Sequence, residues 1–570
     1  MDCLTTVTRA HSYLGSAAAP LGVLLFVFAL AAPAASSTYV VFLPLDSPIY
    51  AELGTLDSLG VLDTYLPEIR PIARVEAARL VLEAARNLRE RAEVDPDTEL
   101  VRATIDALRE QLDEEIEWLE NDREDNPPRL IARPIDRVET QYVFSRGPRR
   151  QMQTPGGKVG IQAVEGTPLW PDNDALPTSP GSNEILRIGG WAGALGFVSA
   201  YGEGAVSGPI TRATGGAWNS NSSRVDSVNG EVVASLGNLA VSFGRGEMAW
   251  GVGHYGSLAQ GANATPFPAL RVQNVHPMRL PGILRYLGPF RFQAFFGQLE
   301  GERQFAHPWI DGQIVAFKPL PDFEFGLTHA IMFGGRGNDN YNFLGFLGRA
   351  SGISTGSVAV GNTNSRAGVF FRLRIPPLRG LELYQELIGE DNLTDEVPKL
   401  GRFVPFIAVS FLGGAYLPRV TQDGRTDFRL EYAILDPNYS THSDSLYWTN
   451  YDSLMGHPMG PNSSRVDLKL GRWFGDRYKF VVGLSYTERA PWLLTRTSVG
   501  ANKERGGGIN FELWRLPLRW QRGAGAMAEL RVRWALEVVD NMNFTARTSV
   551  RALVLISIAI APDWRGLTWQ

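Results

Sequence analysis

The feature that most constrains this chain is a period-two alternation of apolar and polar residues through its later two thirds. In the clearest run, apolar residues take every second position and charged residues stand between them: Leu530, Val532, Trp534, Leu536 and Val538 alternate with Glu529, Arg531, Arg533 and Glu537. Successive side chains of a β-strand point to opposite faces, so the pattern predicts strands with one apolar and one charged face. Similar runs occur at 323–333, 465–470, 478–487 and 550–560. The later part of the chain is therefore predicted to be mostly β.

The lengths of the connections separate two β architectures that share this alternation. A soluble sandwich also has strands with one apolar and one polar face. Here short turns rich in proline or glycine, at 318–322, 376–380 and 474–477, are interspersed with long polar segments at 334–368 and 435–465. Outer-membrane barrels have short turns on one rim and long loops on the other, and a sandwich has no reason to. The connections predict a closed antiparallel transmembrane β-barrel.

The alternating charges predict which face of each strand points outward. Charged side chains are costly toward lipid and comfortable in a watery or plugged lumen, so the apolar faces are expected to face lipid. Aromatic residues such as Tyr478, Tyr486 and Trp534 lie near the ends of these faces, where a lipid-interface girdle would place them. Dividing residues 184–570 by the length of a strand and its loop predicts about 16 to 18 strands, and we expect about 18. Closure leaves no unpaired edge in lipid.

A different period precedes the predicted barrel. Apolar residues recur at spacings of three and four over 75–92 and again over 101–119, which predicts two long amphipathic helices in an antiparallel hairpin. Asp95-Pro96 is expected to cap the second helix, with proline at its first position. The acidic face of that helix is interpreted as solvated; it comprises Glu110, Asp113, Glu114 and Glu117. Residues 37–130 are predicted to form this helical region, and the proline-rich residues 131–183 a connector.

Residues 1–36 have the pattern of a signal peptide. An apolar run from Leu21 to Ala32 is followed by small residues suited to cleavage, and the run is too short for a spanning helix. The single cysteine, Cys3, lies in this segment, so the exported chain is expected to have no disulfide. The helical region would then lie in the periplasm and the barrel in the outer membrane of a Gram-negative bacterium.

Several short strings resemble the Wzi family of outer-membrane capsule assembly proteins. They run in order along most of the chain: Ser47-Pro48-Ile49-Tyr50, Arg70-Pro71, Phe243-Gly244-Arg245, Trp250-Gly251, Asn263-Ala264-Thr265-Pro266, Leu287-Gly288-Pro289, Phe296-Gly297-Gln298-Leu299-Glu300, Phe317-Lys318-Pro319-Leu320-Pro321, Tyr384-Gln385-Glu386, Gly389-Glu390-Asp391, Leu430-Glu431-Tyr432 and Gly456-His457-Pro458-Met459-Gly460. The resemblance implies an 18-stranded barrel that carries a periplasmic helical bundle. It also implies a lectin-like role in holding capsular polysaccharide. The long helical region and the final Trp569-Gln570 depart from the family pattern.

Two polar and aromatic segments are candidates for polysaccharide binding. Sugar rings are bound by flat aromatic faces beside amides and carboxylates. The segment 436–462 is dense in such residues: Tyr439, His442, Tyr447, Trp448, Asn450, Tyr451 and His457. A second patch comprises Asn338, Asp339, Asn340 and Tyr341. The alternative is that the first segment packs against itself and plugs the mouth of the barrel.

A predicted polar cluster in the lumen comprises Arg245, Glu247, Glu300, Glu302 and Arg303. Glu300 and Glu302 invite comparison with a glycosidase pair, but two carboxylates on one strand do not flank a scissile bond. The seven histidines include no close pair at metal-ligand spacing, and Gly-x-Ser-x-Gly is absent. We therefore expect no metal, no cofactor and no catalysis.

The expected function follows from these points taken together. With 55 basic and 60 acidic residues the net charge is −5, which does not favour a nucleic-acid partner. We expect a monomeric barrel in outer-membrane lipid that attaches or organises capsular or related extracellular polysaccharide. The alternatives are a porin-like diffusion channel, which needs an open lumen, and a soluble periplasmic polysaccharide-processing enzyme.

Overall fold

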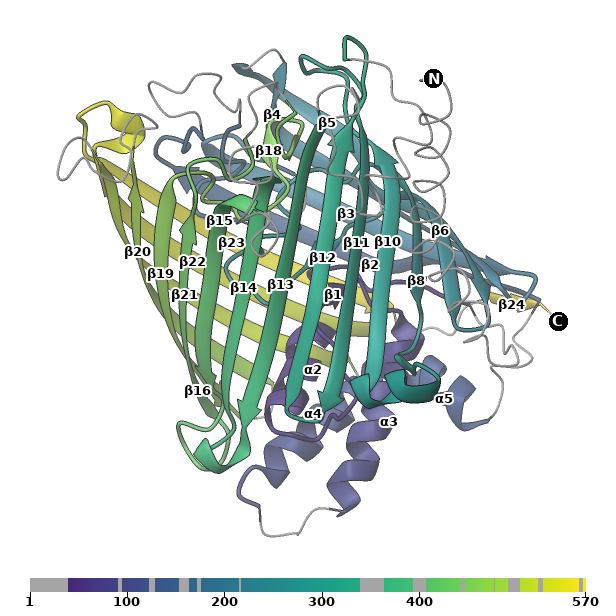
Figure 1. Ribbon diagram of the computed structural model, residues 1–570. Helices are drawn as coiled ribbons and strands as arrows, with labels where there is room; N and C mark the ends of the chain where they lie inside the picture. The colour runs from purple at the N-terminus through teal and green to yellow at the C-terminus, as the bar shows by residue number, and fades with distance from the viewer. Residues whose placement is uncertain are drawn as a thin grey trace, which may run out of the picture.

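Within the residues that the structure describes, eighteen long antiparallel strands close into a barrel (Figure 1). This computed structural model describes residues 39–90, 95–121, 129–152, 163–171, 176–214, 217–338, 363–392, 406–441, 446–475, 477–490, 503–520, 526–562 and 567–569. The predicted signal peptide at 1–36 lies outside these residues. The predicted fold class and strand number are confirmed.

The strands follow one another around the barrel in chain order. They are β2 (Leu130–Arg146), β3 (Gly181–Ala194), β4 (Val198–Thr214), β5 (Ala217–Leu236), β6 (Leu239–Arg245), β8 (Pro268–Asn274), β10 (Pro289–Gln298), β11 (Trp309–Leu320), β12 (Phe323–Phe333), β13 (Thr363–Ile375), β14 (Leu381–Asn392), β15 (Phe406–Leu417), β16 (Thr426–Leu435), β19 (Ser463–Phe474), β20 (Tyr478–Arg489), β21 (Glu504–Trp520), β22 (Ala526–Asp540) and β23 (Ser549–Pro562). Two short strands, β9 (Met278–Arg279) and β24 (Leu567–Trp569), pair with β10 and β2.

The first strand of the barrel lies in the segment that was predicted to be a connector. Strand β2 pairs with β3 on one side and with β23 on the other, so that Val138 lies opposite both Ile188 and Ile560. The register of β2 against β3 shifts between Arg133 and Arg137. Pro134 and the neighbouring charges interrupt the alternation there, which is why the sequence pattern missed this strand. The barrel therefore begins near residue 130 and not at 184.

The strands place their apolar faces outward and their charged faces inward. On β12 and β13, Leu327 is 51% exposed and Val369 is also exposed, whereas Glu324 and Arg366 are buried. The predicted sense of the alternation is thus confirmed, because a sandwich would bury the apolar side chains. An outward apolar face suits lipid, and an inward charged face requires partners inside the barrel.

The two ends of the barrel differ, and we name them by their connections. At the turn end, short turns join β11 to β12, β13 to β14 and β19 to β20. At the loop end lie the long connections, including residues 436–462 between β16 and β19. The helices gather at the turn end (Figure 1): α2 (Pro48–Ser58), α3 (Arg74–Glu90), α4 (Thr98–Gln111) and α5 (Asp113–Glu120). None of the described helices is long and apolar enough to span a membrane.

The second predicted helix is two helices in the structure. It breaks at Leu112, whose φ of −125° and ψ of 27° are not helical, and it begins after Asp97 instead of Asp95. The acidic face is not simply solvated, because Glu114 is buried in an ion pair with Arg133 of β2.

Ion pairs between helices and barrel fix this region at the turn end. Asp97 pairs with Arg419 at 2.6 Å, and Glu110 pairs with Arg477 at 3.2 Å. After the break, Glu114 of α5 pairs with Arg133 of β2, so both helices contact the barrel.

Segments from outside the barrel wall pack inside the barrel. Strand β1 (Ile69–Arg70), from the helical region, pairs with β7 (Ala249–Trp250), from the β6–β8 connection. Around this pair lies one apolar cluster built from distant parts of the chain; its members include Leu66, Ile69, Trp250, Leu258, Phe295, Leu412, Tyr439, Trp448 and Met455. The helical region and two loop-end connections therefore meet inside the barrel and form a plug.

Candidate functional site

The connection between β16 and β19, residues 436–462, closes over the plug at the loop end. Its centre is a small hairpin of β17 (Thr449–Asn450) and β18 (Ser453–Leu454), visible at the loop end in Figure 1. We refer to the described residues of this connection as the mouth loop. The mouth loop contains most of the residues predicted to contact polysaccharide.

Two aromatic side chains of the mouth loop, Trp448 and Tyr439, are buried in the plug. Trp448 is 0% exposed, and the Arg366 guanidinium lies 3.9 Å from the centre of its ring. The Tyr439 hydroxyl donates to the Leu258 carbonyl at 2.8 Å and accepts from the His457 amide at 2.7 Å. A sugar can stack only on an open ring face. The prediction that Trp448 and Tyr439 present such a face is therefore corrected in favour of the alternative, a self-packed plug.

A second set of contacts ties the mouth loop to the β10–β11 connection. Arg303 donates to the carbonyls of Tyr447 at 2.9 Å and Thr449 at 3.1 Å. The Asn450 side chain accepts from the Glu300 amide at 3.2 Å and donates to the Thr265 carbonyl at 2.7 Å. Three loop-end connections are thus cross-linked by hydrogen bonds.

The predicted lumen cluster is divided in the structure. The side chains of Glu300 and Arg303 lie 3.9 Å apart, and both residues hydrogen-bond to the mouth loop. Glu302, in contrast, is exposed. Glu247 accepts a hydrogen bond from the Leu45 amide at 3.2 Å, and Arg245 is exposed. The five residues are therefore not one cluster, because the β6–β8 connection turns into the barrel directly after Arg245.

The accessible part of the predicted binding surface is a rim around the mouth loop. Tyr447, Tyr451 and Asn338 are half-buried, and Glu302 is exposed beside them in the β10–β11 connection. Gln304 and Arg336 are also exposed. The remaining predicted residues, His442, Asp339, Asn340 and Tyr341, lie outside the described residues. We name the exposed and half-buried set Glu302, Gln304, Arg336, Asn338, Tyr447 and Tyr451 the polar rim.

The turn of the β17–β18 hairpin carries backbone strain. Tyr451 and Asp452 have φ of 48° and 58°, the left-handed region in which a two-residue hairpin turn normally places Asn-Gly. Such strain persists only where surrounding contacts hold it. Burial, with the Glu300 and Glu302 carboxylates nearby, raises the pKa of Asp452 to about 6. The sequence offered no signal for this turn, because Tyr-Asp is not a typical turn pair.

We expect the hairpin to loosen as pH rises toward neutrality. The folded hairpin binds the Asp452 proton up to about pH 6, whereas an unfolded Asp loses it near pH 4, so stability falls as pH rises through that window. Amide exchange of residues 449–454, corrected for the intrinsic chemical rate, should therefore show less protection at pH 7 than at pH 4.5. Asp452→Asn should remove this dependence; an unchanged pH profile in that variant would assign the effect to another group.

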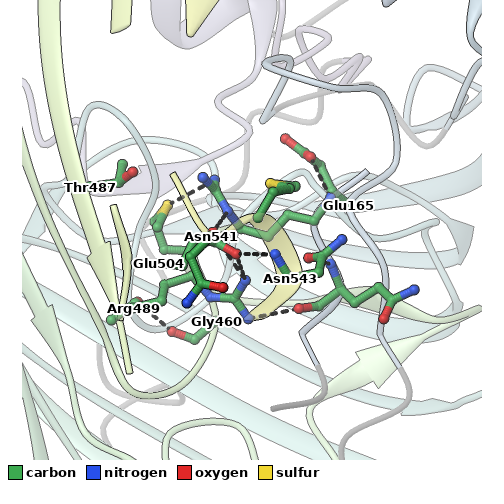
Figure 2. A network of polar contacts seen from close by, with 12 residues as sticks. Glu165, Gly460, Thr487, Arg489, Glu504, Asn541 and Asn543 are labelled. Carbon is green, nitrogen blue, oxygen red and sulfur yellow. Dashed lines mark hydrogen bonds and ion pairs between the residues drawn. The ribbon is translucent and has the colours of Figure 1, made fainter. Parts of the chain in front are cut away.

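A buried charge network joins the mouth loop to the opposite wall of the barrel (Figure 2). Arg150 lies 2.8 Å from Glu504 and 3.4 Å from Glu537, and its Nη1 contacts the Met459 sulfur at 3.6 Å. Arg551 pairs with Glu537 at 2.7 Å and also with Glu165. These side chains come from the β2–β3 connection and from strands β21, β22 and β23.

Figure 2 also shows Glu504 between Arg489 and Asn543. Glu504 lies 3.3 Å from Arg489 and accepts from the Asn543 amide at 2.7 Å. Each carboxylate of the network thus faces more than one donor, which a buried charge requires. The alternation predicted that such residues point inward, but no local signal could pair residues 350 positions apart.

Glu300 and Glu302 do not form a glycosidase-like pair. Glu300 is buried and Glu302 exposed on the same short connection, so they do not face each other across a cleft. Among the residues placed by the structure, no group of three His, Asp or Glu side chains could hold a metal ion.

Comparison with known proteins gives one family. Residues 150–556 match the model of the family described as capsule assembly protein Wzi. The solved structure of Escherichia coli Wzi, described as a carbohydrate-binding β-barrel of the outer membrane involved in group 1 capsule assembly, is 19% identical. The match covers 92% of this chain and 99% of that chain, with a TM-score of 0.60.

Two further likenesses are weaker. An uncharacterised 55.8 kDa protein in the cps region of Klebsiella pneumoniae is 27% identical over 182 residues, which span 31% of this chain and only 36% of that relative. The outer membrane protein OprD from Pseudomonas aeruginosa is 10% identical, with a TM-score of 0.41 over 76% of this chain and 93% of that one. A likeness at that level carries no argument about function.

Proposed function

Because the chain belongs to the Wzi family of capsule assembly proteins, we propose that it is a non-catalytic outer-membrane barrel that binds capsular or related extracellular polysaccharide. Its loop end faces outward and its helices lie in the periplasm, since bacterial outer-membrane barrels keep short turns on the periplasmic side. The closed sheet leaves no strand edge that needs a second subunit, which supports a monomer.

The observation that carries the proposal is the plug beneath a cross-linked polar rim. A diffusion channel needs a continuous watery path, and the cluster around Trp250 and Trp448 packs apolar side chains inside the barrel against strands β8 to β16. A barrel closed in this way can still present loops to a polymer at the surface. Hydrogen bonds from Arg303 to the mouth loop hold those loops in one arrangement, which lowers the entropic cost of binding.

The polar rim supplies the chemistry that a polysaccharide needs. Arg336, Gln304 and Glu302 offer donors and acceptors for hydroxyl and carboxylate groups, and Tyr447 and Tyr451 offer aromatic edges and faces.

We expect the triple substitution Gln304→Ala, Arg336→Ala and Tyr447→Ala to weaken polysaccharide binding. Each lost contact removes about 1 kcal/mol, so the three together should lower affinity on the order of a hundredfold. Binding of purified capsule to the protein in detergent and capsule retention on cells would both be measured. Glu90→Gln, at the exposed end of α3, is the matched control and should bind normally.

A folded triple variant that binds and retains capsule fully would remove the polar rim from the site. Heat-modifiable gel mobility verifies that the barrel is closed in each variant. Trp448→Ala is unsuitable for this test, because emptying a buried tryptophan site costs about 3 to 5 kcal/mol and would disturb the plug.

A further inference from the structure

The connection from β8 to β10 at the turn end folds back over the outer wall of the barrel. Leu280 packs against Phe290 and Phe292, with Met278 and Phe317 beside them. These phenylalanines lie on the outward face, since the intervening Arg291 points inward and donates to the Ile69 carbonyl at 2.9 Å. The connection therefore sits on the lipid side of the barrel and not across its opening.

Gly288 lets this connection lie close to the wall. Its φ is 75°, and a side chain there would collide with the carbonyl of Lys318 in β11. The single turn η2 (Gly282–Leu287) is held just outside the strands by this close approach. Its position is thus fixed by the barrel.

The outer side of η2 is apolar and uncovered in the described structure. Ile283 is 82% exposed and Tyr286 is 69% exposed, and Leu284 is exposed as well. Three large apolar side chains on one six-residue turn are unfavourable in water, at about 25 cal/mol for each Å² left exposed. Such a cluster indicates a partner that is itself apolar.

The charges of the same segment are all positive. No Asp or Glu occurs between Asn274 and Glu300, whereas Arg279 and Arg285 are exposed. The Arg285 guanidinium lies 5.0 Å from the ring centre of Tyr286 and donates to its hydroxyl at 3.1 Å. An aromatic ring beside a cation suits the headgroup level of a bilayer, where the ring lies among the chains and the cation meets phosphate.

Leu287, the last residue of η2, packs against the outward-facing phenylalanines of the wall. Outward rings stack from Phe290 to Phe317 at 5.8 Å and from Phe317 to Phe325 at 5.3 Å. We propose that η2 is an interfacial foot: Ile283, Leu284 and Tyr286 insert into the phospholipid leaflet at the turn end, and Arg279 and Arg285 bind its phosphates. This inference concerns membrane anchoring, goes beyond polysaccharide binding, and rests on the outer-membrane placement proposed above.

Spin labels at three positions test the foot in the full chain. Cysteine replaces Ile283, Leu327 or Glu90 in turn, with Cys3, the one cysteine of the sequence, changed to alanine. Each labelled protein is placed in vesicles of phosphatidylethanolamine and phosphatidylglycerol, and collisions with oxygen and with a water-soluble nickel chelate are compared. The Leu327 label lies on the outward face at mid-strand and reports lipid, and the Glu90 label reports water.

The label at position 283 is expected to behave like the label at Leu327. Its ratio of oxygen collision rate to nickel-chelate collision rate should be several-fold above that of the label at Glu90. If the label at Leu327 reports lipid while the label at Ile283 reports water, insertion of η2 into the leaflet is refuted and the outer-membrane placement of the barrel stands. If Leu327 also reports water, the placement itself fails. Arg279→Gln with Arg285→Gln should make the Ile283 label shallower in phosphatidylglycerol vesicles than the parent, and an unchanged depth would overturn the role of the arginines.

Discussion

Replacing residues 248–264 by a short Gly-Ser linker is expected to turn a barrel without steady current into a conducting pore. This segment carries Trp250 and Leu258, which lie in the apolar cluster of the plug, and β7, which pairs with β1. Arg245 lies directly opposite Pro268 in neighbouring strands, so a short linker can join β6 to β8 without straining the wall. Planar-bilayer recordings should show no resolved conductance steps for the unmodified protein. The shortened variant should give a sustained open-channel current.

The control for this experiment is Trp448→Phe, which keeps an aromatic side chain at the centre of the same plug and should stay closed. Heat-modifiable mobility would establish that the shortened protein still forms the barrel. Large steady currents from the parent would favour the diffusion channel over the proposed function. A closed, non-conducting variant would show that residues 66–69 and the mouth loop fill the lumen by themselves.

Glu537→Ala is expected to lower the free energy of unfolding by about 3 to 5 kcal/mol, because it leaves buried arginines without a full set of partners. Arg551 and Glu537 are almost completely buried and lie 2.7 Å apart, and Arg150 lies 3.4 Å from the same carboxylate. Urea unfolding in detergent or lipid, followed by gel mobility, would measure the change. We expect the loop end to open first, since Arg150 also contacts the mouth loop through Met459.

Glu488→Ala is the matched control for Glu537→Ala. Glu488 pairs with Lys503 and with Arg505 at the loop-end surface, where the Glu488 side chain is 26% exposed. Exposed pairs contribute about 0 to 1 kcal/mol, so this variant should unfold nearly like the parent. Equal effects of the two substitutions would contradict the view that burial makes the inner network essential.

The predicted polysaccharide site shows what local composition can and cannot predict. Aromatic and amide residues in the mouth loop correctly marked a structured segment at one end of the barrel. The same residues were expected to face outward, yet Trp448 and Tyr439 point into the plug. A run of aromatic residues is equally compatible with a sugar platform and with a core, and only contacts with Arg366 and Leu258 distinguish the two.

The N-terminal boundary shows a similar limit. Strand β2 contains Pro134 and a shift of register, so its alternation was too irregular to identify it as a strand. Its role depends on β23, more than 400 positions later, where Ser557 donates to Glu139. Helix positions were predicted well from apolar spacing, whereas the break at Leu112 was not predicted.

By itself the sequence determined that most of the chain forms a membrane barrel and which strand faces point outward, because period and polarity are local properties and lipid and water favour opposite faces. Tertiary structure alone decided what fills the lumen, which aromatic side chains are buried and how the charges pair. Those outcomes depend on packing among segments hundreds of residues apart, where shape and partner geometry count and local pattern carries no information.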